Sequence, residues 1–176
     1  MSINDSGDPR QRLVAAAETQ FRRFGYRRTT IEDITAEADT GKGSLYLHFD
    51  SKQEIYLAVV TESLNRFVQQ DTEVLARHDT VPHRLAALVE TTAHQYGEDE
   101  LLRASLFGLD DLVAGRVAKM AAEIQRDKIC ALLLEVIVEG QEDGSIRRDL
   151  DAKAAAVVVF EMGWAIVRAE IEGHNS

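Results

Sequence analysis

The sequence has few of several residue types, and each shortage excludes a class of protein. Its single cysteine, Cys130, cannot form an intrachain disulfide or build a zinc finger. Two prolines and eleven glycines in 176 residues are too few for a loop-rich or all-β chain. The longest apolar run, residues 154–160, is far shorter than the ~20 residues that cross a membrane. The first residues lack the basic start and apolar stretch of a signal peptide. We therefore expect a soluble cytoplasmic protein with no membrane partner.

The sequence also offers little for catalysis or metal binding. It contains neither a His-Glu-x-x-His zinc pattern nor a glycine-rich phosphate loop. Its five histidines share no metal-ligand spacing. We therefore expect no catalytic residue, no metal and no cofactor. An all-helical enzyme that uses a cavity in the C-terminal part is an alternative, although nothing in the sequence identifies its catalytic group.

The negative charge is distributed unevenly along the chain. Residues 1–52 carry eight basic and eight acidic side chains, so the whole net charge of −10 belongs to residues 53–176. An N-terminal segment that is less acidic than the rest is typical of a nucleic-acid-binding region attached to an acidic body. Ordinary solvated helix faces would give the same pattern, so the charge alone does not decide between the two.

Helical periodicity runs along the whole sequence, with apolar residues three and four positions apart and no strand-like alternation of useful length. It predicts an all-α fold. The first eight residues are expected to be flexible. The predicted helices cover residues 9–24, 30–38, 42–48, 51–78, 81–96, 99–108, 112–139 and 151–172.

Local start and stop signals mark the first three helices. Asp8 is a candidate N-cap with Pro9 in the first helical position, and Gly25 is a candidate stop. Thr30 and Asp33 have the spacing of a capping box, with Asp in place of the usual Glu or Gln. The segment 39–41, Asp-Thr-Gly, then breaks the second helix, because both Asp and Gly tolerate a left-handed backbone.

A helix, a three-residue break and a short helix form the pattern of a helix-turn-helix over residues 30–49. In that motif the second helix enters the major groove of DNA. Periodicity places Leu45 and Phe49 in the core. The side chains on the opposite face can contact phosphates or base edges; they are Lys42, Ser44, Tyr46 and His48.

Three stretches in this region together resemble the N-terminal domain of the tetracycline-repressor (TetR) family. They are residues 21–26 (Phe-Arg-Arg-Phe-Gly-Tyr), 29–34 (Thr-Thr-Ile-Glu-Asp-Ile) and 41–52 (Gly-Lys-Gly-Ser-Leu-Tyr-Leu-His-Phe-Asp-Ser-Lys). The resemblance covers about residues 9–58. It implies a three-helix helix-turn-helix domain over residues 9–52. A larger helical ligand-binding and dimerisation domain would follow over residues 53–176.

The resemblance also implies a function. It points to a homodimeric transcription regulator, most often a repressor, that binds a near-palindromic double-stranded operator. An unidentified small-molecule effector would release it. The homodimer would form through the helices at about residues 112–139 and 151–172. Carried over position by position, the DNA-binding residues would be Arg28, Thr29, Thr30, Thr40, Lys42, Gly43, Ser44, Tyr46, His48 and Lys52.

The turn departs from the family's usual Gly-Val-Ser, because this chain has Asp39, Thr40 and Gly41. An acidic side chain beside the DNA-facing surface is unfavourable, and the short helix loses a serine N-cap. Asp39 and the zero net charge of residues 1–52 leave a second interpretation open, in which the protein is a helical module that binds small molecules or proteins and no longer reads DNA.

The C-terminal part contains aromatic and polar residues among apolar ones. We take them as candidates for the lining of an effector cavity, with ordinary core packing as the competing interpretation for each. They are Phe67, His94, Tyr96, Phe107, Met120, Phe160 and Trp164.

Overall fold

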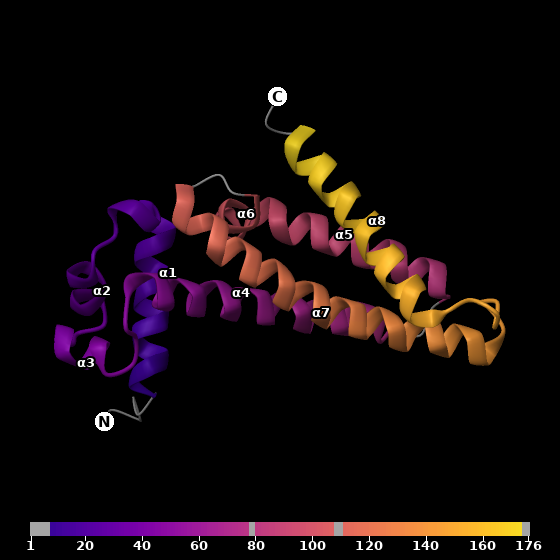
Figure 1. Ribbon diagram of the computed structural model, residues 1–176, viewed down its shortest axis with the longest axis horizontal. Helices are drawn as coiled ribbons and strands as arrows, with labels where there is room; N and C mark the ends of the chain where they lie inside the picture. Colours follow the sequence, from indigo (N-terminus) through magenta and orange to yellow (C-terminus); the bar gives the residue numbers. More distant parts are fainter. Residues whose placement is uncertain (1–7, 78–79, 108–110, 174–176) are drawn as a thin grey trace, which may run out of the picture. The chain divides into compact units, whose positions relative to one another are not determined.

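The computed structural model describes residues 8–77, 80–107 and 111–173, which form eight α-helices (Figure 1). The expected flexible segment lies outside the described residues up to residue 7, and so does the last residue of the helix expected over residues 99–108. In chain order the helices are α1 (Pro9–Arg28), α2 (Ile31–Glu37), α3 (Lys42–Tyr46), α4 (Lys52–Leu75), α5 (Val81–Glu98), α6 (Glu100–Phe107), α7 (Asp111–Asp143) and α8 (Ala152–Gly173).

The all-α prediction is confirmed, and each predicted helix corresponds to an observed one. One difference is at the end of α7, where Gly140 does not stop the helix. A β-carbon at Gly140 would lie 2.9 Å from side-chain carbons of Ile146. The glycine therefore makes room for the returning chain, and the Ile146 amide donates to the Gly140 carbonyl at 2.7 Å. The helix ends at Asp143, before the left-handed Gly144.

The predicted signals at both ends of α1 are present. The Asp8 carboxylate caps the helix by accepting from the Arg10 amide at 3.1 Å, and Pro9 follows in the first turn. Gly25 has the left-handed φ of 75° that was expected of a stop. However, the chain resumes a helical turn after Gly25 and ends α1 at Arg28, where the Thr29 amide donates back to the Gly25 carbonyl.

The chain divides into two compact units, one comprising residues 1–63 and 104–121, the other residues 64–103 and 122–176. The change of unit after residue 63 falls inside α4. In the first unit, α1, α2, α3 and the start of α4 share a core of fully buried apolar side chains. Among them are Leu13, Val14, Phe21, Ile34, Leu45, Phe49 and Ile55.

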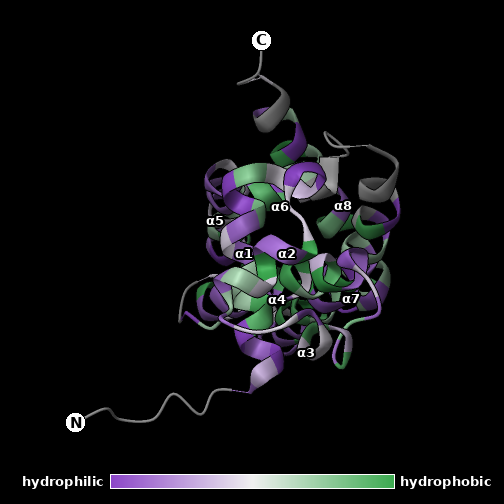
Figure 2. Cartoon of the chain, turned by 90° about the vertical axis from the view of Figure 1, so that its left-hand side faces the viewer, coloured by the Kyte–Doolittle hydropathy of each residue, from purple (hydrophilic) through white to green (hydrophobic). Residues whose placement is uncertain are grey.

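In the second unit, α5 packs against α8. A core cluster joins α4, α5, α7 and α8 through Leu75, Val81, Leu88, Ile129, Leu133, Val136, Ile137 and Ala156. Hydrophilic and hydrophobic residues share the same helices (Figure 2), as expected of amphipathic helices with one buried face. Within the described residues, no helix combines the length and the hydrophobicity needed to span a bilayer.

Candidate nucleic-acid interface and ligand pocket

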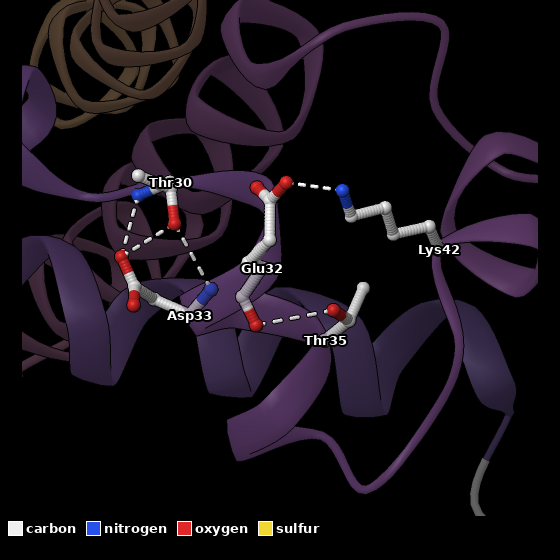
Figure 3. Close-up of polar contacts among 5 residues, drawn as sticks. All are labelled: Thr30, Glu32, Asp33, Thr35 and Lys42. Carbon is white, nitrogen blue, oxygen red and sulfur yellow. Dashed lines mark hydrogen bonds and ion pairs between the residues drawn. The ribbon is translucent and has the colours of Figure 1, made fainter.

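The second helix begins at the predicted capping box (Figure 3). The Asp33 amide donates to the Thr30 hydroxyl oxygen at 3.1 Å, while the Thr30 amide donates to the Asp33 carboxylate at 2.8 Å. The Thr30 hydroxyl also donates to the same carboxylate oxygen at 2.6 Å. These bonds lower the pKa of Asp33. The reciprocal pairing satisfies two backbone donors at the helix start and fixes where α2 begins.

The turn between α2 and α3 is held by backbone bonds and by one left-handed residue. Asp39 has φ 48°, so Asp39 rather than Gly41, with φ −91°, occupies the left-handed position. The Thr40 amide donates to the Thr35 carbonyl at 2.9 Å and the Asp39 amide to the Ala36 carbonyl at 3.2 Å. This pair of bonds is a Schellman motif, which ends α2 and directs the chain into α3. Gly41 then precedes α3 without a side-chain cap, as the sequence predicted.

The third helix has one buried and one exposed face. Leu45 and Phe49 are buried in the first unit, which anchors the helix as predicted. Tyr46 is 53% exposed and Leu47 is 83% exposed, an unusual position for a leucine. Sequence reasoning missed Leu47. The sequence did contain a signal. Leu47 lies between Leu45 and Phe49, and one helix face cannot bury all three side chains.

Lys42, at the start of α3, forms an ion pair with Glu32 of α2 (Figure 3). Both side chains are exposed. The hydrogen bond between them lowers the pKa of Glu32 and raises the pKa of Lys42. Because exposed ion pairs are weak, a phosphate can compete with Glu32 for the ammonium group.

Most of the predicted DNA-binding residues are at least partly exposed. Five are exposed, namely Arg28, Thr30, Lys42, Gly43 and Tyr46. Four are half-buried, namely Thr40, Ser44, His48 and Lys52. With the exposed Leu47, these residues include hydrogen-bonding, basic and apolar side chains. Such a mixture suits contact with both the backbone and the base edges of DNA.

Thr29 is the exception, because its side chain lies in the core and not on this surface. It is fully buried, and its hydroxyl donates to the carbonyls of Gln20 at 3.2 Å and Gly25 at 2.9 Å. The hydroxyl therefore closes the last turn of α1 after its interruption at Gly25. The structure assigns this side chain a packing role where the resemblance implied a phosphate contact.

Lys52 is also occupied inside the domain. Its ammonium group donates to the carbonyls of Tyr26 at 2.8 Å and Thr29 at 2.9 Å. It lies 4.4 Å from the centre of the Tyr26 ring, a cation–π contact. Burial lowers the pKa of this lysine. These contacts tie the start of α4 to the end of α1, so a phosphate contact by Lys52 would have to share the ammonium group with them.

A pocket of about 260 Å³ lies in the second unit between α5, α7 and α8. Its wall is almost wholly apolar, with side chains such as Leu88, Ile129 and Val167. Met162 and Ile166, which are largely exposed, stand at its rim. Concave apolar sites with few polar groups are the usual form of a small-molecule pocket.

Aromatic and polar side chains are buried next to this pocket. The Tyr96 ring contacts the rings of Phe67 and Trp164, with centroids 5.5 and 5.3 Å away, both edge to face. Asp71 is 1% exposed and receives a weak bond from the Gln95 amide nitrogen at 3.4 Å. Burial raises the pKa of Asp71 to about 7, against the opposing effect of the Gln95 bond.

The predicted cavity residues separate into three groups. Phe160 and Trp164 line the pocket, and Phe67 and Tyr96 are connected to it through ring contacts. His94 and Met120 are exposed and do not line it, because their helices turn them to solvent. The side chain of Phe107 lies outside the described residues. Among the described side chains, no group of three or more His, Cys, Asp or Glu residues could hold a metal ion.

Comparison with known proteins agrees with this arrangement. Residues 13–59 match the model of a family described as bacterial regulatory proteins, tetR family. The chain is 32% identical over 170 residues to the HTH-type transcriptional repressor DhaR of Mycobacterium sp. strain GP1, covering 93% of this chain and 83% of that protein.

Two solved structures have the same fold. The fatty acid degradation regulator FadR from Bacillus halodurans has a TM-score of 0.70 at 22% identity, covering 98% of this chain and 89% of that one. FadR from Bacillus subtilis in complex with stearoyl-CoA has a TM-score of 0.67 at 19% identity, covering 94% and 89%. With the exposed helix-turn-helix surface, these similarities show that the chain belongs to the tetR family of bacterial regulatory proteins and is a DNA-binding regulator of transcription.

Proposed function

We propose that this regulator is a repressor that binds a near-palindromic operator as a homodimer and is released by a small effector in the pocket between α5, α7 and α8. The observation that carries the proposal is the exposed face of α3. Tyr46 at the end of α3 and the next residue, Leu47, are exposed, while Leu45 anchors the helix in the core. The similarity to DhaR, which is named a repressor, supports repression rather than activation.

The exposed face of α3 can contact DNA in two ways. Lys42 supplies a positive charge for a phosphate or a guanine edge, and the Tyr46 hydroxyl can bond a phosphate oxygen. Leu47 offers an apolar surface for the methyl group of thymine. Two such helices in a twofold dimer would read half-sites about 34–36 Å apart. Such binding weakens steeply as salt rises.

The dimer would use α7 and α8. Val158, Met162 and Ile166 are spaced four residues apart on α8 and are 56%, 63% and 48% exposed. Residues at this spacing share one helix face. An exposed apolar stripe of this kind is a typical subunit contact. A partner helix on the stripe would also cover Met162 and Ile166 at the rim of the pocket.

The apolar pocket supports an effector with a hydrophobic body. The Bacillus subtilis relative was solved with stearoyl-CoA, a molecule with a long apolar chain. Release from DNA requires that the effector bind the DNA-free conformation more tightly than the DNA-bound one. A tenfold loss of operator affinity needs a difference of about 1.4 kcal/mol between the two affinities.

Selection of duplexes from a random pool by the purified protein tests the DNA-binding part of this proposal. We expect a near-palindromic sequence to be enriched, and we expect it to repress a reporter placed behind it. Enrichment of a single unrepeated half-site would contradict the dimer, and activation of the reporter would contradict repression.

The dimer has its own test. Val158→Glu places a charge on the apolar stripe but outside the pocket lining. We expect it to yield monomers in sedimentation analysis and to lose tight operator binding. Lys153→Glu, on another side of the same helix, is the control and should stay dimeric. Equal behaviour of the two variants would show that the stripe is not the contact.

A further inference from the structure

The pocket between α5, α7 and α8 contains few polar groups. Of the fifteen residues that line it, all of them described, none is charged. The polar side chains in the pocket wall are those of Thr92 on α5 and Gln125 on α7, both uncharged. The indole nitrogen of Trp164 adds one further polar atom. A ligand charge placed in such a wall would lose its hydration without gaining a partner, which is far more costly than burying an uncharged group.

Gln125 is the more deeply buried of the two uncharged polar residues Gln125 and Thr92. It is only 5% exposed, although α7 is a surface helix over much of its length. Hydrogen bonding from its side chain opposes the rise that burial causes in the pKa of Tyr96. Tyr96 in turn is held between the rings of Phe67 and Trp164. A primary amide both donates and accepts hydrogen bonds, so it can serve a hydroxyl or a carbonyl group.

We infer that the effector is an uncharged, mainly apolar molecule with one hydrogen-bonding oxygen, and that Gln125 is the residue that recognises this oxygen. The inference rests on the proposed function, because it takes the pocket to be the effector site. The volume of about 260 Å³ lies just below the range of roughly 300–1,000 Å³ typical of ligand pockets. A charged headgroup would have to remain outside, beyond Met162 and Ile166 at the rim.

Asp71 provides the alternative interpretation, in which a cationic ligand pairs with a buried carboxylate. Two observations weigh against it. Asp71 does not line the pocket, and its carboxylate faces the Gln95 amide. The Gln95 amide nitrogen in turn is shared with Gln70 at 2.9 Å. The carboxylate therefore belongs to a polar cluster with Gln95 and Gln70, whereas Gln125 lines the pocket itself.

The single tryptophan of the chain is Trp164, which lines the pocket, so its fluorescence reports binding there directly. Three probes of the same chain length separate the ligand classes: decanol is neutral, decanoate is anionic and decylammonium is cationic. We expect decanol to change the Trp164 emission with saturation. We expect each charged probe to bind at least about tenfold more weakly, given the desolvation cost of a charge.

Substitution of the recognising residue completes the test. Gln125→Leu keeps a similar side-chain volume and should weaken decanol about five- to tenfold, the effect of one lost hydrogen bond. Thr92→Val, the matched control for the other polar position, should change the affinity less. Equal or tighter binding of a charged probe, or unchanged decanol affinity in Gln125→Leu, would overturn the inference while leaving the pocket as the site. No change in emission with any probe would instead refute the pocket itself.

Discussion

Lys42 of α3 forms an ion pair with Glu32 of α2, which ties the basic group of the DNA-facing helix to an acid of the helix before it (Figure 3). When DNA binds, the Lys42 ammonium group must therefore exchange the Glu32 carboxylate for a group of the DNA. Because both groups are exposed, the exchange costs little, and the charge of Glu32 remains close to the incoming phosphates.

Glu32→Gln should strengthen operator binding. Removal of the carboxylate releases Lys42 and removes a repulsion between Glu32 and the DNA phosphates, so we expect the affinity to rise a few-fold. The measurement is a binding titration at low salt. Glu18→Gln removes the acid of another ion pair, with Arg22 on α1, and should have a smaller effect. Weaker binding by Glu32→Gln would show that the ion pair positions α3.

Thr30→Ala should destabilise the first unit by about 1 kcal/mol, because it removes the side-chain half of the capping box. Urea unfolding measures the change. Thr19→Ala is the control, because the Thr19 hydroxyl only donates to the Ala15 carbonyl within α1, and this loss should be neutral or slightly stabilising. Equal effects of the two substitutions would contradict a specific role for the cap.

Thr29→Val should lower the free energy of unfolding by about 1–3 kcal/mol, because two buried carbonyl contacts lose their donor. The slope of log affinity against log salt should stay unchanged, since a buried hydroxyl neutralises no phosphate. Thr29→Ser retains the donor and should remain close to the native stability. A reduced salt slope in Thr29→Val would contradict this and would support the phosphate contact that the family resemblance implied.

Asp71 should make the stability depend on pH. Its pKa is about 7 in the folded chain, compared with an ordinary value of 3.8, so the folded state holds this proton more tightly than the unfolded state. The stabilisation is complete below pH 4 and is lost as the pH rises to about 7, by up to ~1.4 kcal/mol per pH unit.

Comparison with Asp71→Asn isolates this effect from other titrating groups. Between pH 4 and pH 7, the native chain should lose stability relative to the variant. Above pH 7 the difference between their unfolding free energies should level off. A difference that is constant across this range would show that Asp71 ionises normally.

Features set by short stretches of sequence were predictable. The Asp8 cap, the left-handed Gly25 and the capping box of Thr30 with Asp33 depend on residues within a few positions of one another. The break at residues 39–41 was also predicted, although only the structure assigned the left-handed φ to Asp39.

Features set by contacts distant in sequence were not predictable. Lys52 reaches back to the carbonyl of Tyr26, and Thr29 to that of Gln20, so neither side chain could be placed from periodicity. The lining of the cavity was still harder to predict, because Gln125 is a polar residue on an amphipathic helix and would be expected at the surface. Its burial follows from the packing of α5, α7 and α8 together.

The central claim is that α3 reads operator DNA, and a salt titration of operator affinity tests it most directly. The native chain is compared with the double variant Lys42→Ala and Tyr46→Ala, and with Lys153→Ala as an exposed control on α8. We predict that the double variant loses sequence preference and that its salt slope falls by about one, the contribution of one lost phosphate contact, while the control is unchanged. Undiminished and equally salt-dependent operator binding by the double variant would contradict the account.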